Sequence, residues 1–217
     1  MTVRLAIFDC DGTLVDGQAA ICNAMETAFA SAGLPAPDRH EVRRIVGLSL
    51  PQAIRLLAPD AEEALHHRAV DAYKEAFRAC RLDGTLEEPL FDGIANVLAR
   101  LTERGWTLGV ATGKSDRGLA SCLAAHGIAD RFVTLQTADR HPSKPHPAML
   151  EAALVEAGAE PADAVMIGDT TFDMEMARAA GVHAIGVAWG YHTERELRDA
   201  GAEHVAASPA ELGDLLS

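Results

Sequence analysis

The chain of 217 residues has few basic side chains, few cysteines and no long hydrophobic run. Lysine and arginine together number 19 against 32 aspartates and glutamates, which gives a formal net charge of −13. Nucleic acids and anionic membrane surfaces are bound by clustered lysine and arginine, so this composition argues against both as partners. It does not exclude an anionic small molecule, because a cation or a few local basic groups can reverse the charge within a site.

The four cysteines, at positions 10, 22, 80 and 122, lie far apart and lack the spacing of a metal site. Reduced thiols in the cytosol fit this pattern, and Cys10 is expected to point into the core without a catalytic role. No stretch reaches the length of a membrane span, and the first residues lack the features of a signal peptide. We therefore expect a cytoplasmic protein with no membrane partner, and both a monomer and a homodimer remain open.

The stretch of residues 5–16 carries the strongest functional signal. The apolar run Leu5–Phe8 predicts a short buried strand, and the polarity changes at Asp9, where Gly12 marks a turn. Side chains i and i+2 of an extended chain point the same way, so Asp9 and Asp11 are expected to reach one point beyond the strand. An ionised Asp9 can act there as a nucleophile, and a protonated Asp11 can act as a general acid.

The sequence Asp9-Cys-Asp-Gly-Thr-Leu-Val-Asp16 resembles the first motif of the haloacid dehalogenase (HAD) superfamily of phosphatases, DxDGT followed by Leu or Val. An ordinary turn is the alternative interpretation, because Asp-Gly is common in turns and the triplet recurs at Asp83-Gly-Thr85. The second copy follows no apolar strand, which favours the functional interpretation of the first.

Hydrophobic periodicity divides the rest of the chain into two parts. Residues 17–88 show helical patterns, whereas from about Pro89 short apolar strands alternate with helices. Further strands are predicted at Trp106–Ala111, Phe132–Leu135, Ala164–Ile167, His183–Val187 and Glu203–Ala206. The predicted fold class is α/β, with a Rossmann-like doubly wound parallel sheet from residues 1–16 and 89–217 and an inserted α-helical cap domain from residues 17–88.

Three further motifs resemble those of the HAD superfamily, follow predicted strands and occur in family order. Val110-Ala-Thr-Gly-Lys114 resembles the second motif, Pro142-Ser-Lys-Pro145 the third, and Gly168-Asp-Thr-Thr-Phe-Asp173 the fourth. Each has an ordinary alternative: a threonine at a strand end, a surface lysine in a proline-rich turn, or aspartates at a helix N-terminus. The combination of four motifs at successive strand ends favours the functional interpretation.

The resemblance implies a catalytic role for each matched residue. Asp9 is the nucleophile, and Asp11 is the general acid and later the base. Thr112, the Gly113 amide and Lys144 hold the phosphoryl group, and Lys144 offsets the repulsion between the nucleophile and the phosphate.

The resemblance also implies a Mg²⁺ cofactor, held by Asp9, the Asp11 carbonyl and Asp169, with Asp173 behind them. The expected function is a Mg²⁺-dependent phosphatase that acts on a small phosphorylated metabolite through an aspartyl phosphate. Metal-independent dehalogenases of the superfamily typically lack the second Asp of the first motif, so Asp11 favours a phosphatase. A phosphomutase of the same superfamily and a non-catalytic module that binds a phosphorylated ligand are the alternatives.

The cap position and the ending Gly186–Tyr191 resemble the phosphoglycolate phosphatase-like branch, which also includes pyrophosphatases and sugar phosphatases. Gly47-Leu-Ser-Leu50 resembles the loop by which such caps approach the site, and Arg43 and Arg44 precede it. Adjacent helical residues point about 100° apart, so at most one arginine is expected to face the substrate, and a solvated helix face is the alternative.

Other candidates in the cap and the site loops are interpreted as structural. Lys74, the only lysine of the cap, fits a solvated helix face better than the Schiff-base lysine of phosphonatases. The histidines lack the spacing of a transition-metal site. Three of them fall near predicted site loops and are expected to be exposed: His141, His146 and His192.

Overall fold

The computed structural model describes residues 2–217, so Met1, the first residue of the predicted sheet domain, lies outside the described part. The described residues form a six-stranded parallel sheet in the order β3-β2-β1-β4-β5-β6. Its strands are β1 (Arg4–Phe8), β2 (Trp106–Thr112), β3 (Phe132–Thr137), β4 (Ala164–Gly168), β5 (His183–Val187) and β6 (His204–Ala206). The prediction of a doubly wound parallel sheet is confirmed, and this strand order is that of Rossmann-type folds.

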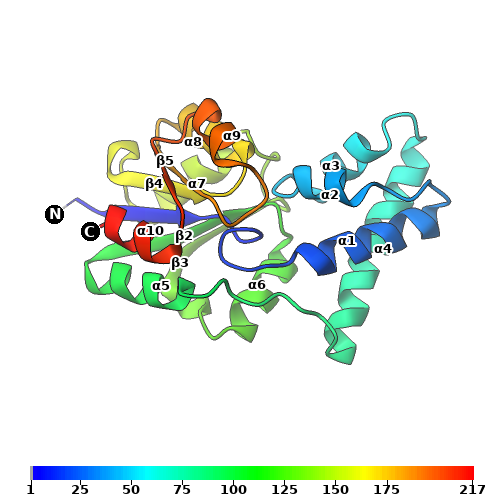
Figure 1. Cartoon of the computed structure of the whole chain (residues 1–217), viewed down its shortest axis with the longest axis horizontal. Coiled ribbons are helices and arrows are strands. Elements are labelled where there is room, and N and C mark those ends of the chain that lie inside the picture. Colours follow the sequence, from blue (N-terminus) through cyan, green and yellow to red (C-terminus); the bar gives the residue numbers. More distant parts are fainter. Residues whose placement is uncertain (1) are drawn as a thin grey trace.

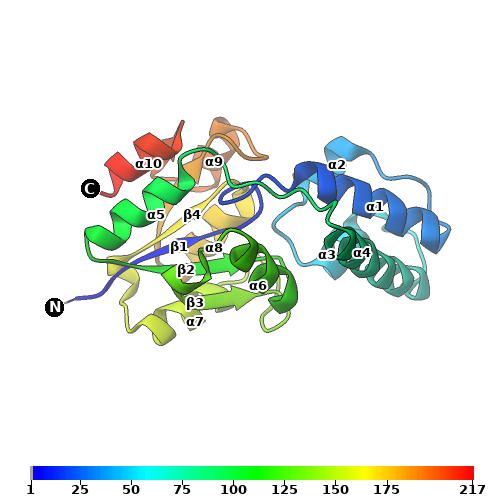
Figure 2. The same ribbon diagram turned by 90° about the horizontal axis from the view of Figure 1, so that it is seen from below.

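Helices cover both faces of the sheet (Figures 1 and 2). They are α5 (Ile94–Glu103), α6 (Asp116–Ala125), α7 (Ala148–Ala157), α8 (Thr171–Ala180), α9 (Glu194–Ala200) and α10 (Pro209–Leu215), with short 3₁₀ turns at Ala129–Arg131 and Pro161–Asp163. Alternate residues of β1 serve the two layers: Ala6 and Phe8 pack with α5, α6 and α10, whereas Leu5 and Ile7 pack with α7, α8 and α9. Among residues 2–217, no helix combines the length and apolar character that a membrane crossing requires.

Parallel pairing brings the ends of the central strands to one edge. Phe8 of β1 pairs with Val110 of β2 on one side and with Ile167 of β4 on the other. The residues that follow these strands therefore leave the sheet side by side. The strand order also reverses between β1 and β4, which is where doubly wound sheets bind ligands.

Residues 17–88, all of which the structure describes, form four helices and no strand; we call them the helical insertion. The helices are α1 (Gln18–Ala32), α2 (Arg39–Arg44), α3 (Leu50–Leu57) and α4 (Glu63–Asp83). They have an apolar core of their own, which includes Phe29 and Ile54. The insertion lies beyond the edge of the sheet where β1 ends (Figure 2).

The two connections between the helical insertion and the sheet run side by side. The N–H of Asp16 donates to the carbonyl of Pro89 at 2.8 Å, and the N–H of Phe91 donates to the carbonyl of Leu14 at 3.0 Å. Val15 also pairs with Leu90 in an antiparallel bridge. Both connections therefore pass directly beside the turn that follows β1.

Candidate active site

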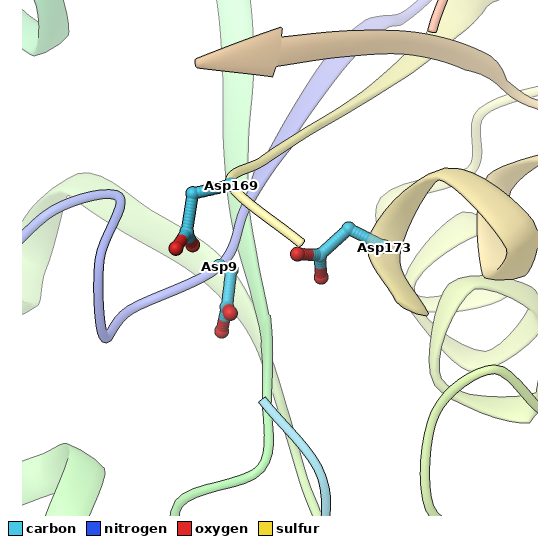
Figure 3. A group of neighbouring side chains, drawn as sticks. All are labelled: Asp9, Asp169 and Asp173. Carbon is cyan, nitrogen blue, oxygen red and sulfur yellow. The ribbon is translucent and has the colours of Figure 1, made fainter. Parts of the chain in front are cut away.

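Three buried carboxylates meet where β1 and β4 end (Figure 3). Asp9 follows β1, Asp169 follows β4, and Asp173 lies in the first turn of α8. One oxygen of each carboxylate lies within 4.8 Å of the others. Within residues 2–217 this is the one group of three or more His, Cys, Asp or Glu side chains that are close enough to hold a metal ion. All three residues are fully buried.

Asp9 has one engaged oxygen and one free oxygen. Its Oδ1 accepts a hydrogen bond of 2.6 Å from the Cys10 N–H and lies 3.0 Å from Nζ of Lys144. No donor among the described residues reaches its buried Oδ2. Burial raises the pKa of Asp9 to about 7, although the Lys144 ammonium lowers it in part. Oδ2 is therefore the oxygen available to a metal ion or to an electrophile.

Asp173 and Lys144 form a buried ion pair beside Asp9. Oδ1 of Asp173 accepts a hydrogen bond of 2.6 Å from Nζ of Lys144, and its Oδ2 accepts from the N–H and the hydroxyl of Thr170 at 3.1 and 2.7 Å. Burial disfavours the Lys144 ammonium, but Asp173 and Asp9 outweigh it and raise the pKa of Lys144. Lys144 therefore remains a cation, and Asp173 anchors it.

Asp169 is oriented by two donors that have no assigned role in the sequence analysis. The Thr13 hydroxyl donates to its Oδ1, and the Tyr191 N–H donates to its Oδ2, both at 2.9 Å. The chain passes so close at Gly12 (φ +80°) that an added Cβ would lie 2.2 Å from Oδ2, so only glycine fits there. Burial, then the charges of Asp173 and Asp9, raise the pKa of Asp169 well above its usual value.

The charge of this group fits a divalent cation. Three carboxylates share one ammonium, that of Lys144, and the raised pKa values of Asp9 and Asp169 reflect burial and mutual repulsion. A bound cation would favour the ionised carboxylates. Carboxylate oxygens, one of them without a partner, are the hard ligands that Mg²⁺ prefers. The residues present therefore fit the expected metal.

The end of β2 and a loop of the helical insertion meet beside Asp9. Thr112 is buried, and its hydroxyl accepts from the Lys114 N–H at 3.3 Å. A Cβ on Gly113 would lie 2.5 Å from the carbonyl oxygen of Leu48, so the loop between α2 and α3 packs directly against the end of β2. A Cβ on Gly47 would lie 3.8 Å from Oδ2 of Asp9. The loop predicted to approach the site therefore does so.

The Asp11 carboxylate pairs with Lys114, and its negative charge is one of the causes that raise the pKa of Asp9. Oδ1 of Asp11 lies 2.9 Å from Nζ of Lys114, which also donates a 2.6 Å hydrogen bond to Glu88. Burial raises the pKa of Asp11, and Lys114 opposes that shift. No role was assigned to Lys114 or Glu88 from the sequence.

A cavity of about 580 Å³ lies between the helical insertion and the sheet edge, beside Asp11; we call it the leaving-group cavity. The sheet and the helices that cover it, which we call the sheet domain, contribute Gly113, Lys114 and residues of α6 to its lining. Most of the remaining lining comes from the helical insertion, both from its helices and from the loop between α2 and α3; it includes Val42, Leu48, Tyr73, Lys74, Phe77, Arg78 and Arg81. The volume is that of a typical small-molecule site.

Neither Arg43 nor Arg44 is among the described residues that line the leaving-group cavity. The Arg44 guanidinium instead makes a bidentate pair with Glu196 of α9, at 3.1 and 2.7 Å. On the same short helix, Val42 is buried and lines the cavity, which directs Arg44 toward the sheet domain. The structure therefore does not bring the two predicted arginines to the site.

The expectation of exposure holds for His146 and fails for His141 and His192. His192 is only 4% exposed; its Nδ1 accepts from the Thr171 N–H at 3.1 Å, and its Nε2 lies 3.0 Å from the carbonyl of Arg44. Burial lowers the pKa of His192, so it links the helical insertion to α8 as a neutral ring. His146 is exposed and His141 is half-buried.

The structural interpretations of Cys10 and Lys74 agree with the structure. Cys10 is fully buried, with its Sγ 4.0 Å from Sγ of Cys122. Lys74 is exposed, at the edge of the leaving-group cavity.

Comparison with known proteins gives consistent matches. Residues 6–187 match the family model described as haloacid dehalogenase-like hydrolase. The chain is 39% identical to the probable phosphatase IndB of Dickeya dadantii, covering 98% of this chain and 90% of that protein. It is 32% identical to a phosphoglycolate phosphatase of Nitrosococcus oceani, over 99% and 96% of the two chains. A predicted phosphatase from Clostridium acetobutylicum has a similar structure, with a TM-score of 0.88 at 26% identity, covering 100% of this chain and 99% of the other. The chain thus belongs to the haloacid dehalogenase-like hydrolase family and is a phosphatase of that family.

Proposed function

We propose that this phosphatase hydrolyses a small phosphorylated metabolite, phosphoglycolate-like or a sugar phosphate, with Mg²⁺ and through an aspartyl phosphate. The observation that carries the proposal is the free, buried Oδ2 of Asp9, beside Asp169 and the Lys144 ammonium. An unpartnered carboxylate oxygen in a buried site is costly to maintain unless a ligand engages it. The reduced thiols expected from the sequence make the cytoplasm the proposed location.

In the first half-reaction, Oδ2 of Asp9 forms a bond to phosphorus while the bond from phosphorus to the leaving oxygen breaks. Lys144 stabilises the negative charge around Asp9, and the Thr112 hydroxyl and the Gly113 N–H donate to the phosphoryl oxygens. A proton passes from the Asp11 carboxyl to the leaving oxygen. The products are the aspartyl phosphate and the free alcohol.

In the second half-reaction, the oxygen of a water molecule bonds to phosphorus while the bond to Asp9 breaks. The Asp11 carboxylate takes a proton from that water, which returns both side chains to their starting states. Asp9, the Asp11 carbonyl and Asp169 would hold Mg²⁺, and the positive charge of the ion would offset the negative charge of the phosphate.

The leaving-group cavity supports a small organic leaving group. It combines apolar side chains such as Phe77 with the cations Lys74, Arg78 and Arg81 and the acidic Asp71 and Glu75, and the helical insertion supplies most of its lining. An anionic or hydroxyl-rich leaving group fits such a surface. We therefore assign substrate choice to the helical insertion and phosphoryl chemistry to the sheet domain.

The test is a panel of phosphorylated metabolites assayed for inorganic phosphate with Mg²⁺ and with EDTA. We expect turnover that depends on Mg²⁺ and is absent in Asp9→Asn, an almost isosteric change that cannot attack phosphorus. Thermal unfolding of the variant checks that the fold is intact.

Either of two results would overturn the proposal: full activity without a divalent metal, or a wild-type rate from Asp9→Asn on p-nitrophenyl phosphate. A requirement for a sugar bisphosphate, with transfer instead of phosphate release, would identify a phosphomutase.

A further inference from the structure

Lys114 lies between two carboxylates at the wall of the leaving-group cavity. Its Nζ is 2.9 Å from Oδ1 of Asp11 and 2.6 Å from Oε1 of Glu88. The three side chains are almost buried, with exposed fractions of 10% for Lys114, 11% for Asp11 and 6% for Glu88. One buried cation therefore holds two buried carboxylates in fixed positions.

This ion-pair network joins Asp11 to both connections of the helical insertion. Glu88 belongs to the returning connection, and its carbonyl oxygen is 2.7 Å from Nε2 of His126 on the sheet domain. Gly17 belongs to the outgoing connection, where an added Cβ would lie 2.9 Å from Oδ1 of Asp11 and 3.6 Å from Oε1 of Glu88. The Asp11 carboxylate is thus enclosed by backbone on one side and by Lys114 on the other.

Stability alone is a poor explanation for this arrangement. The desolvation cost of a buried ion pair often exceeds its Coulombic gain, and here two carboxylates share one ammonium. Lys144, which is fully buried, pairs instead with Asp9 and Asp173. Lys114 differs from it because it lines the leaving-group cavity together with Asp11.

We infer that Lys114, held in place by Glu88, is a positioning residue that fixes the Asp11 carboxyl group toward the leaving oxygen. The inference rests on the proposed role of Asp11 as general acid and base. The proton given to the leaving oxygen and the proton taken from water both pass through this one carboxyl group. Contact of Lys114 with Oδ1 leaves Oδ2 for these transfers, and a misplacement of about 1 Å can cost about 100-fold in rate.

The test compares two substrates of similar shape, phenyl phosphate and p-nitrophenyl phosphate. The phenolate leaving group is more basic and depends more on protonation. Lys114→Met is expected to lower kcat/KM for phenyl phosphate at least ten-fold more than for p-nitrophenyl phosphate. Lys114→Arg, which keeps the cation, should recover most of the loss. Glu88→Gln should show the same selectivity with a smaller loss.

A matched control removes an ion pair far from the site. Arg100→Met breaks the pair between Arg100 of α5 and Asp214 of α10, at the end of the molecule away from the helical insertion (Figure 2). It is expected to leave kcat/KM unchanged for both substrates. Thermal unfolding of every variant distinguishes a loss of the fold from a displacement of the Asp11 carboxyl group. If Lys114→Met does not fold, Lys114→Arg and Glu88→Gln provide the comparison.

A double variant decides whether Lys114 acts through Asp11. Asp11→Asn combined with Lys114→Met should be no slower than Asp11→Asn alone, because the group that Lys114 positions is already lost. Additive losses, or equal losses on both phenyl substrates, would overturn the inference. If Asp9→Asn and Asp11→Asn impair turnover while the Lys114 effect is additive, the proposed function stands and only this inference fails.

Discussion

Replacing Asp169 with asparagine is expected to stabilise the metal-free protein and to abolish its response to Mg²⁺. The carboxylate oxygens of Asp169, Asp9 and Asp173 lie within 4.8 Å of one another, with Lys144 as their shared cation. At that separation two unit charges repel by about 3.5 kcal/mol at an effective dielectric of about 20. Proton uptake relieves part of this repulsion, so we expect a net gain of about 1 to 2 kcal/mol.

The substitution keeps the hydrogen bonds of Asp169. The Tyr191 N–H donates to Oδ2, and the Thr13 hydroxyl donates to Oδ1. An amide oxygen facing Tyr191 accepts the first of these bonds. The amide NH₂ then donates to the Thr13 hydroxyl, which can act as donor or acceptor. The fold is therefore expected to tolerate the change, and the electrostatic effect is what the measurement reports.

Thermal unfolding in EDTA and in Mg²⁺ provides the assay. For a protein of this size, 1 kcal/mol shifts Tm by about 2–4 °C, so Asp169→Asn should melt about 2–8 °C above wild type in EDTA. At a Mg²⁺ concentration of about 100 times Kd, wild type should gain about 2.7 kcal/mol, or about 5–11 °C. The variant should gain nothing.

Asp214→Asn is the control, because this exposed carboxylate pairs with Arg100 far from the site. It should change neither the Tm in EDTA nor the response to Mg²⁺ by more than about 2 °C, as expected for a surface pair. An Asp169→Asn protein that melts below wild type in EDTA and still gains stability from Mg²⁺ would refute the reasoning on both counts.

Three further outcomes are expected. Thr13→Val removes a donor to Asp169 and should weaken Mg²⁺ binding by about 10–100-fold, measured by calorimetry; unchanged affinity would contradict the contact. Gly113→Ala places a methyl group against the insertion loop and should cost about 1–3 kcal/mol in urea unfolding, whereas Gly213→Ala, which meets only a flexible arginine, should be nearly neutral. Hydrogen bonds from Thr193, then from Arg44, lower the pKa of Glu196 to about 2, so Glu196→Gln should be less stable than wild type near neutral pH. That difference should narrow as pH falls from 4.5 toward 2; a constant difference would contradict the assignment.

The sheet and the carboxylate group were predictable because both depend on local pattern. Runs of four or five apolar residues, such as Leu5–Phe8 and Ala164–Ile167, identify strands buried on both faces. Parallel pairing then brings the residues after such strands to one edge, which places Asp9 beside Asp169 without any knowledge of packing. The predicted strand ends agree with the structure to within two residues.

Contacts between segments distant in sequence were not predictable. Arg44 pairs with Glu196 across 152 positions, and Lys114 pairs with Glu88 across 26, so no local pattern indicates either contact. Each depends on how the helical insertion is set against the sheet domain.

Each of the two lysines of the site lies between two carboxylates. Nζ of Lys144 is 2.6 Å from Asp173 and 3.0 Å from Asp9, and Nζ of Lys114 is 2.6 Å from Glu88 and 2.9 Å from Asp11. Each lysine is thus closer to a carboxylate that has no proposed role in the reaction, Asp173 or Glu88, than to the carboxylate that is proposed to react, Asp9 or Asp11. A buried lysine whose sole partner lost its charge would be left unpaired, which is strongly unfavourable. A second, non-reacting carboxylate removes that difficulty, so Asp9 can be phosphorylated and Asp11 protonated while both lysines remain paired.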